Sequence, residues 1–201
     1  MAEMQETHRD RILNASTDCF LELGFERTST AEIARRAKVS KREIYAHFAD
    51  KRTILAEVII RLQGDMQQRL GGVWSSSGEL ETVLLQAAKI LHGFVRSELF
   101  GKMLRIVATE AYHDPEVARK FYESGLASGR LETAEYMRRQ MRLGKLKKSD
   151  PFVAANDFLD LAIGSQLMTA VILGQIDREP VRRNHVKHVV EMFLRGHAPA
   201  A

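Results

Sequence analysis

The sequence is poor in the residue that builds disulfide frameworks and zinc sites, because its 201 residues include a single cysteine, Cys19. One cysteine cannot form a disulfide within the chain, so a disulfide-bonded scaffold is excluded and a reducing compartment is expected. Cys19 lies among the apolar positions of the first predicted helix. We expect it to be a small buried hydrophobic residue rather than a redox sensor.

Long apolar runs are also missing. The N-terminus, MAEMQETHRDR, is polar and has no apolar core segment of the kind that a signal peptide needs. The best membrane candidate, Leu161 to Gly174, has about fourteen residues and is interrupted by Ser165 and Gln166, so it is too short to span a bilayer. We therefore expect a cytoplasmic protein with no membrane contact.

Local signatures of catalysis are absent as well, since there is no phosphate-binding Gly-rich loop, no cysteine cluster and no nucleophile motif. Glu110 and His113 form a Glu-x-x-His pair, but a di-iron bundle needs two such pairs and two further carboxylates. His185 and His188 are also three residues apart, but they lie among basic residues that would repel a cation. We expect no metal, no other cofactor and no catalytic residues.

Period-2 segments and hairpin turns, the marks of β-structure, are not found, which predicts an all-α fold. Apolar spacing predicts a first helix over residues 9–23, ended by Gly24, and a helix of about twenty residues after the N-cap Asp50. Gly71, Gly72 and the Ser75–Gly78 run predict a flexible break behind this helix.

Five further helices are predicted in the second part of the chain, over residues 79–98, 101–112, 115–143, 151–174 and 180–195. Asp114-Pro115 and Asp150-Pro151 supply an N-cap and a proline at the first helical position, and Pro180 opens the last helix. The small residues at 125–129 predict a kink.

The stretch Thr28–Arg52, TSTAEIARRAKVSKREIYAHFADKR, contains two marked helix starts. Ser29 with Glu32, and Ser40 with Glu43, each fit the capping box, in which a hydroxyl and a carboxylate satisfy free amides at a helix start. Two short helices joined by a tight turn are typical of a helix-turn-helix reader of DNA, with the motif at about residues 30–49.

The second of these helices has a distinct inner and outer face. Ile44 and Phe48, one turn apart, are expected to point to the core. On the outer side, Arg42 and Ala46 are expected to lie opposite these two residues, with Lys41, Tyr45 and His47 on the flanks. Such a face suits the major groove, where donors can reach base edges.

Positive charge gathers on the same segment. From Arg35 to Arg52 there are seven basic residues against two acids, a net of five positive charges, whereas the whole chain carries only +4. Lys and Arg draw a protein to phosphates and release condensed counterions. A charge run alone is more often a solvated helix surface, but the paired capping signals and the small Ala46 favour DNA binding.

These residues resemble the N-terminal signature of the TetR family of transcriptional regulators over residues 9 to 60. The resemblance rests on Gly24-Phe25 and Thr28, Ile33-Ala34, Val39-Ser40-Lys41, Ile44 to Phe48, and Lys51. Ala46 departs from the pattern, because many members carry a second aromatic residue there. The predicted DNA contacts are Thr28, Thr30, Lys41, Arg42, Tyr45, Ala46, His47 and Lys51, of which the resemblance assigns Tyr45, His47 and Lys51 to phosphates.

The C-terminal helices carry apolar residues well beyond one stripe, so they need a second surface to bury them. The residues alone leave open whether that surface belongs to the same chain or to a second copy. The TetR resemblance implies a homodimer. The predicted interface is Phe158, Ile163, Leu167, Met168, Val189 and Phe193.

The resemblance also implies that a small, apolar molecule binds in the second domain. Met, Phe and Tyr between residues 58 and 168 fit such a site, although the same residues are as often ordinary core. The predicted effector pocket is Leu62, Met66, Leu91, Phe94, Leu104, Phe121 and Tyr122.

We interpret the chain as an N-terminal helix-turn-helix domain over residues 1–52 and a larger helical domain for effector binding and dimerisation over residues 53–201. The predicted function is that of a repressor that binds a near-palindromic, double-stranded DNA operator and is released by its ligand. The competing class is a helical-bundle enzyme or a protein-binding adaptor. A second basic run at 138–148 is interpreted as solvated helix ends.

Overall fold

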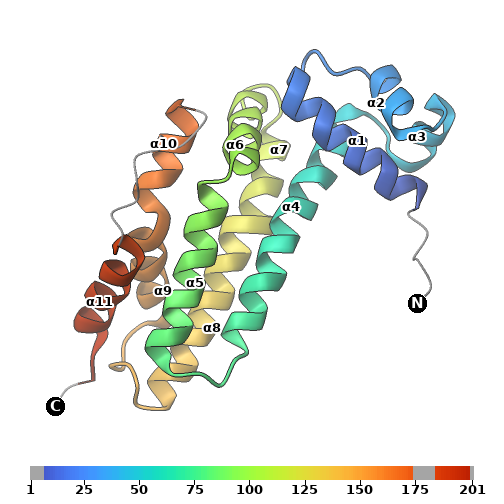
Figure 1. Ribbon diagram of the computed structural model, residues 1–201. Helices are drawn as coiled ribbons and strands as arrows, with labels where there is room; N and C mark the ends of the chain where they lie inside the picture. Colours follow the sequence, from blue (N-terminus) through green and yellow to red (C-terminus); the bar gives the residue numbers. More distant parts are fainter. Residues whose placement is uncertain (1–6, 174–183, 200–201) are drawn as a thin grey trace. The chain divides into compact units, whose positions relative to one another are not determined.

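The computed structural model describes residues 7–173 and 184–199, and all regular structure in these ranges is helical (Figure 1). The all-α fold predicted from the sequence is therefore confirmed. The helices are α1 (His8–Leu23), α2 (Thr30–Ala37), α3 (Lys41–His47), α4 (Lys51–Trp74), α5 (Leu80–Val95), α6 (Glu98–Glu110), α7 (Pro115–Phe121), the π-helical segment η1 (Tyr122–Ala127), α8 (Ser128–Arg142), α9 (Pro151–Leu159), the π-helical segment η2 (Asp160–Gly164), α10 (Ser165–Leu173) and α11 (His185–His197).

The chain forms two compact units. The first comprises Met1–Leu62 with Ile106–Phe121, and the second comprises Gln63–Arg105 with Tyr122–Ala201. The first unit therefore includes part of α4 and the segment 106–121, beyond the predicted boundary at residue 52. The division into a DNA-binding domain and an effector domain at that boundary stays a prediction.

In the first unit, α1 packs against both α2 and α3, and α2 packs against α3 (Figure 1). The core of these helices is made by fully buried apolar side chains that include Ile12, Phe20, Ile33 and Ile44. Gly24 ends α1, as predicted, with a positive φ of 82° that favours glycine.

In the second unit, α8 packs against α9 and η1, and α5 packs against α11, η2 and α10. Aromatic rings fill the space between these helices. Phe158 lies edge-on to both Trp74 and Phe193, with ring centroids 6.2 and 5.4 Å apart. None of the helices in the described ranges combines the length and the apolar character that a bilayer crossing requires.

Some predicted boundaries were wrong. The helix α4 continues through Gly71 and Gly72 to Trp74, so the break begins only at Ser75. The helix predicted over 79–98 ends at Val95, because Ser97 caps a new helix: its Oγ accepts a hydrogen bond of 3.2 Å from the amide of Phe100.

Both predicted Asp-Pro helix starts are confirmed. Asp114 accepts from the Glu116 amide at 3.1 Å, and Asp150 accepts from the Phe152 amide at 2.8 Å. The prediction that Pro180 opens the last helix falls outside the described residues, and α11 is described from His185.

Two π-helical segments replace what the sequence predicts as a kink and as uninterrupted helix. The segment η1 overlaps the kink expected at 125–129, and within it Gly125 packs directly on the buried side chain of Gln63. A Cβ added at Gly125 would lie 2.6 Å from Gln63 Cδ. The helix expected over 151–174 is divided by η2 into α9 and α10.

Candidate nucleic-acid interface

The helix α2 begins at Ser29, whose Oγ accepts a hydrogen bond of 3.2 Å from the Glu32 amide. The predicted capping box is only half formed, because the Glu32 carboxylate does not return to the N-cap. It binds Arg35 at 2.7 and 2.9 Å and Arg36 at 2.8 Å. These hydrogen bonds lower the pKa of Glu32 to about 2.

The turn between α2 and α3 depends on a left-handed residue that is not glycine. Lys38 has φ 54° and ψ 47°, and its amide donates to the carbonyls of Ala34 and Arg35. This conformation costs an L-residue roughly 1 kcal/mol, and it closes the end of α2. It brings the Lys38 side chain, which is exposed, to the turn of the motif.

The helix α3 begins with a complete capping box. The Glu43 amide donates to Ser40 Oγ at 3.1 Å, and the Ser40 amide donates to Glu43 Oε2 at 2.7 Å. The hydrogen bond from the Ser40 backbone is the main reason why the pKa of Glu43 is lowered. The other carboxylate oxygen of Glu43, Oε1, lies 2.8 Å from His8 Nδ1, and this contact ties the start of α1 to α3.

The two faces of α3 are as predicted. Ile44 and Phe48 are buried, with 0% and 2% of their surfaces exposed. All the residues predicted for the outer face are exposed: Lys41, Arg42, Tyr45, Ala46 and His47. The hydroxyl of Tyr45 lies 3.3 Å from that of the half-buried Thr30, so the start of α2 and the outer face of α3 present their hydroxyls together.

The positive charge of the motif is less than the sequence count suggests. Arg36 binds Glu22 at 2.7 Å as well as Glu32, and Arg35 binds Glu32, so both arginines are already paired. Within the described part of the chain, Lys38, Lys41 and Arg42 have no acidic partner. The unpaired charge is therefore concentrated on the turn and on the first turn of α3.

Two predicted contacts are placed differently from what the sequence suggests. Thr28 is 2% exposed, and its hydroxyl donates to the carbonyls of Cys19 and Gly24 at 3.1 and 2.7 Å. Its side chain is thus part of the core, and a DNA contact by Thr28 stays a prediction. Lys51 is half-buried, and its ammonium donates to the carbonyls of Phe25 and Glu26 at 2.7 and 3.3 Å.

Two family models match this chain. Residues 12–58 match the model of bacterial regulatory proteins of the tetR family, which covers the motif described above. Residues 82–199 match the model of the AefR-like transcriptional repressor, C-terminal domain. The chain belongs to the TetR family. It is therefore a DNA-binding transcriptional regulator and not an enzyme, as predicted.

Similar proteins cover nearly the whole TetR-family chain. The uncharacterised HTH-type transcriptional regulator Rv2250c of Mycobacterium tuberculosis (strain ATCC 25618 / H37Rv) is 29% identical over 186 residues, 92% of this chain and 93% of that protein. Among solved structures, a TetR-family transcriptional regulator from Mesorhizobium loti MAFF303099 has a TM-score of 0.87 at 26% identity, covering 95% of this chain and 96% of that one. The flavonoid-responsive regulator FrrA has a TM-score of 0.78 at 30% identity, covering 96% and 98%.

The residues predicted for the TetR-type dimer interface are mostly core. Phe158, Val189 and Phe193 are 0%, 3% and 1% exposed, and Ile163 is 8% exposed, so these four residues pack within their own chain. Leu167 is half-buried, and Met168, with 64% of its surface exposed, is open to a partner. The exposed apolar residues of α9 and α10 are Phe152, Val153, Met168, Val171, Ile172 and Leu173.

The residues predicted for the effector pocket do not belong to one unit. Leu62 and Phe121 lie in the first unit, and Met66, Leu91, Phe94, Leu104 and Tyr122 lie in the second. Leu91, Leu104 and Phe121 are buried, Leu62, Met66 and Phe94 are half-buried, and Tyr122 is 47% exposed. Their role in ligand binding stays a prediction.

Proposed function

We propose that this TetR-family regulator is a repressor whose homodimer binds a near-palindromic operator and releases it when a small molecule binds. One observation carries the DNA-binding part of this proposal. The outer face of α3 is exposed and carries two cations without acidic partners, Lys41 and Arg42, on a helix that the complete capping box at Ser40 holds in place.

Different roles are proposed for different positions on this surface. Arg42 lies on the side of α3 opposite to Ile44 and Phe48, and a guanidinium can bind the O6 and N7 of guanine at once, so we assign it to base reading. Tyr45, His47 and Thr30 flank this face and are assigned to phosphates, which position a protein without selecting sequence. Lys38, at the turn, joins the phosphate contacts.

A second copy of the chain is needed because one α3 reads only a half-site. Two reader helices must lie roughly 34 Å apart, one turn of DNA, which makes the operator an inverted repeat. The exposed apolar surface of α9 and α10, above all Met168 and Ile172, supports a dimer in which these helices meet their copies.

The effector is proposed to be a small, apolar molecule that binds in the C-terminal domain. A related protein of 30% identity, FrrA, is described as flavonoid-responsive, which supports a flat, mainly apolar effector for this chain as well. Because its DNA target would be chromosomal, we propose that the protein acts in the cytoplasm. A ligand that shifts the DNA-bound population from about 99% to 1% must favour the released form by about 5.5 kcal/mol.

The proposal is tested by selecting bound fragments from genomic DNA and measuring affinity for the enriched site. We expect an inverted repeat, and we expect Arg42→Ala to cost about 1 to 3 kcal/mol on that site while relaxing preference at one base position. Lys38→Ala is the matched control, because it should weaken specific and random DNA equally. If no fragment is enriched, the proposed function fails; if Arg42→Ala weakens all sequences equally, only its base-reading role fails.

A further inference from the structure

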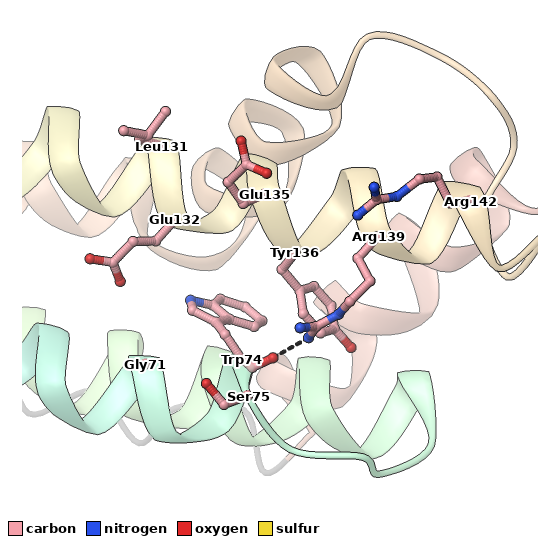
Figure 2. A pocket seen from close by; sticks show the side chains of 9 residues that line it. All are labelled: Gly71, Trp74, Ser75, Leu131, Glu132, Glu135, Tyr136, Arg139 and Arg142. Carbon is pink, nitrogen blue, oxygen red and sulfur yellow. Dashed lines mark hydrogen bonds between the residues drawn. The ribbon is translucent and has the colours of Figure 1, made fainter.

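The second unit contains a pocket that no predicted effector residue lines. It has a volume of about 470 Å³ and lies between the end of α4 and α8 (Figure 2). Trp74 contributes from α4, and residues between Leu131 and Arg142 contribute from α8. Pockets for small molecules commonly measure about 300–1,000 Å³, so this one is large enough for a ligand of one or two rings.

The base of the pocket is a fixed aromatic surface. The rings of Trp74 and Tyr136 lie 4.7 Å apart, and both residues are more than nine-tenths buried. The guanidinium of Arg139 lies 5.2 Å from the centroid of the Tyr136 ring and donates to the Trp74 carbonyl, which ties α8 to the end of α4 (Figure 2). A flat ring can therefore pack against the part of Trp74 that lines the pocket, on a surface that does not need to be ordered by the ligand.

The charges around the pocket are not all balanced. Glu135 forms an ion pair with Arg138, and the guanidinium of Arg139 donates a hydrogen bond to the Trp74 carbonyl. Arg142 is exposed, so water already solvates its charge. Glu132 differs, because it is half-buried and has neither a hydrogen bond nor an ion pair within the part of the chain that the structure describes.

Glu132 extends from α8 toward α4, beside the indole of Trp74 (Figure 2). Burial raises the pKa of its carboxyl group, which expresses the cost of holding an uncompensated negative charge there. A cation placed against this carboxylate would remove that cost. An anion would be repelled by the same group.

We propose that this pocket binds a planar aromatic cation, with its ring against Trp74 and Leu131 and its charged group on the carboxylate of Glu132. The site is separate from the proposed operator surface and from the predicted effector residues, so it is a second ligand site of the C-terminal unit. An aromatic amidinium has the required shape, because its flat cationic group matches the two oxygens of a carboxylate.

The experiment uses the fluorescence of Trp74, the single tryptophan of the sequence, as a reporter inside the site. The full-length protein is titrated with benzamidine, with its neutral analogue benzamide and with the anion benzoate. We expect a saturable change with benzamidine alone. The indole N–H signal of Trp74 in a nuclear magnetic resonance spectrum gives a second readout of the same titration.

The variant Glu132→Gln keeps the shape of the side chain and removes its charge, and we expect it to weaken benzamidine binding about tenfold, as for loss of one charged hydrogen bond. Glu81→Gln on α5 is the matched control and should leave the affinity unchanged, because Glu81 is exposed and does not line the pocket. The proposal is overturned if benzamidine gives no saturable change, if benzamide or benzoate binds as well, or if Glu132→Gln binds like the unaltered protein. The three-probe comparison uses unaltered protein and so does not depend on how a variant folds.

Discussion

Lys51 has a structural role in this chain that competes with the phosphate contact implied by the TetR resemblance. Its ammonium donates to the carbonyls of Phe25 and Glu26 and lies 4.3 Å from the centroid of the Phe25 ring. It thereby joins the start of α4 to the loop that follows α1. We predict that Lys51→Met, which keeps most of the apolar stem, destabilises the free protein.

The magnitude follows from these contacts. A hydrogen bond to a charged group contributes roughly 1.5–3 kcal/mol, and an exposed cation–π contact about 0.5–1 kcal/mol. The bond to Glu26 is long at 3.3 Å, and Lys51 is only half-buried, so water replaces part of what is lost. We therefore expect the free energy of unfolding to fall by about 2 kcal/mol.

Two measurements decide between the structural role and the phosphate contact. Urea unfolding followed by circular dichroism reports stability, and binding to random duplex DNA at several salt concentrations reports phosphate contacts. Loss of one phosphate contact should flatten the plot of log affinity against log salt by roughly 0.9. The control, Lys41→Met, removes an exposed and unpaired cation, so it should flatten this slope and leave stability within about 0.5 kcal/mol.

The reasoning about Lys51 is refuted if Lys51→Met unfolds like the unaltered protein and flattens the salt dependence as Lys41→Met does. In that case Lys51 contacts a phosphate in the complex and does not stabilise the free protein. A loss of stability with an unchanged slope would instead make Lys51 a purely structural residue. Both effects together would show that its third N–H donor reaches a phosphate while the other two hold the loop.

Three further predictions concern other parts of the chain. Burial raises the pKa of Glu110 above 4.5 and leaves its Oε2 without a hydrogen bond, so the free energy of unfolding should fall as the pH rises through that raised pKa. The variant Glu110→Gln should abolish this fall and be about 1 kcal/mol more stable than the unaltered protein at pH 7. Thermal melts that show stability rising over the same pH range would contradict this prediction. Ser40→Ala removes the cap of α3 and should cost about 1 kcal/mol in urea unfolding, with weaker operator binding; unchanged stability would argue against the capping box. Ile172 is 67% exposed, and Ile172→Asp should weaken the dimer measured by sedimentation. Leu143, at the end of α8, is 62% exposed, and Leu143→Asp should leave the dimer unchanged. Equal behaviour of both variants would remove the surface around Ile172 from the proposed interface.

The helix-turn-helix was predictable because its signals are local. Capping residues three positions apart and apolar residues one turn apart determine the start and the inner face of α3, and the structure agrees at Ser40, Ile44 and Phe48. The state of Glu32 was not predictable in the same way, since its carboxylate can bind either the N-cap amide or the arginines one turn later. Arg36 binds Glu22 of α1 as well as Glu32, and this tertiary contact holds its guanidinium where the Glu32 carboxylate can bind it. No local spacing in the sequence encodes a contact with α1.

The helix that carries most of the predicted dimer surface was predicted less well because of η2. The prediction assumed one regular helix over 151–174, in which each residue turns about 100° from the last. A π-helical turn holds one extra residue, so the face of α10 is rotated relative to the pattern of α9. Met168 and Ile172, which follow the insertion, are exposed, and periodicity alone does not reveal such an insertion.

The contact between Gly125 of η1 and Gln63 of α4 links the evolution of two distant positions. Gln63 is 3% exposed and accepts a hydrogen bond from Ser124, so its amide has little freedom to move away from a new side chain. Any larger residue at 125 would first require a shorter one at 63, and this order of change is the only one without an overlapping intermediate. Substitutions at the two positions should thus be epistatic: Gly125→Ala alone is harmful, and the same change becomes tolerable after Gln63→Ala.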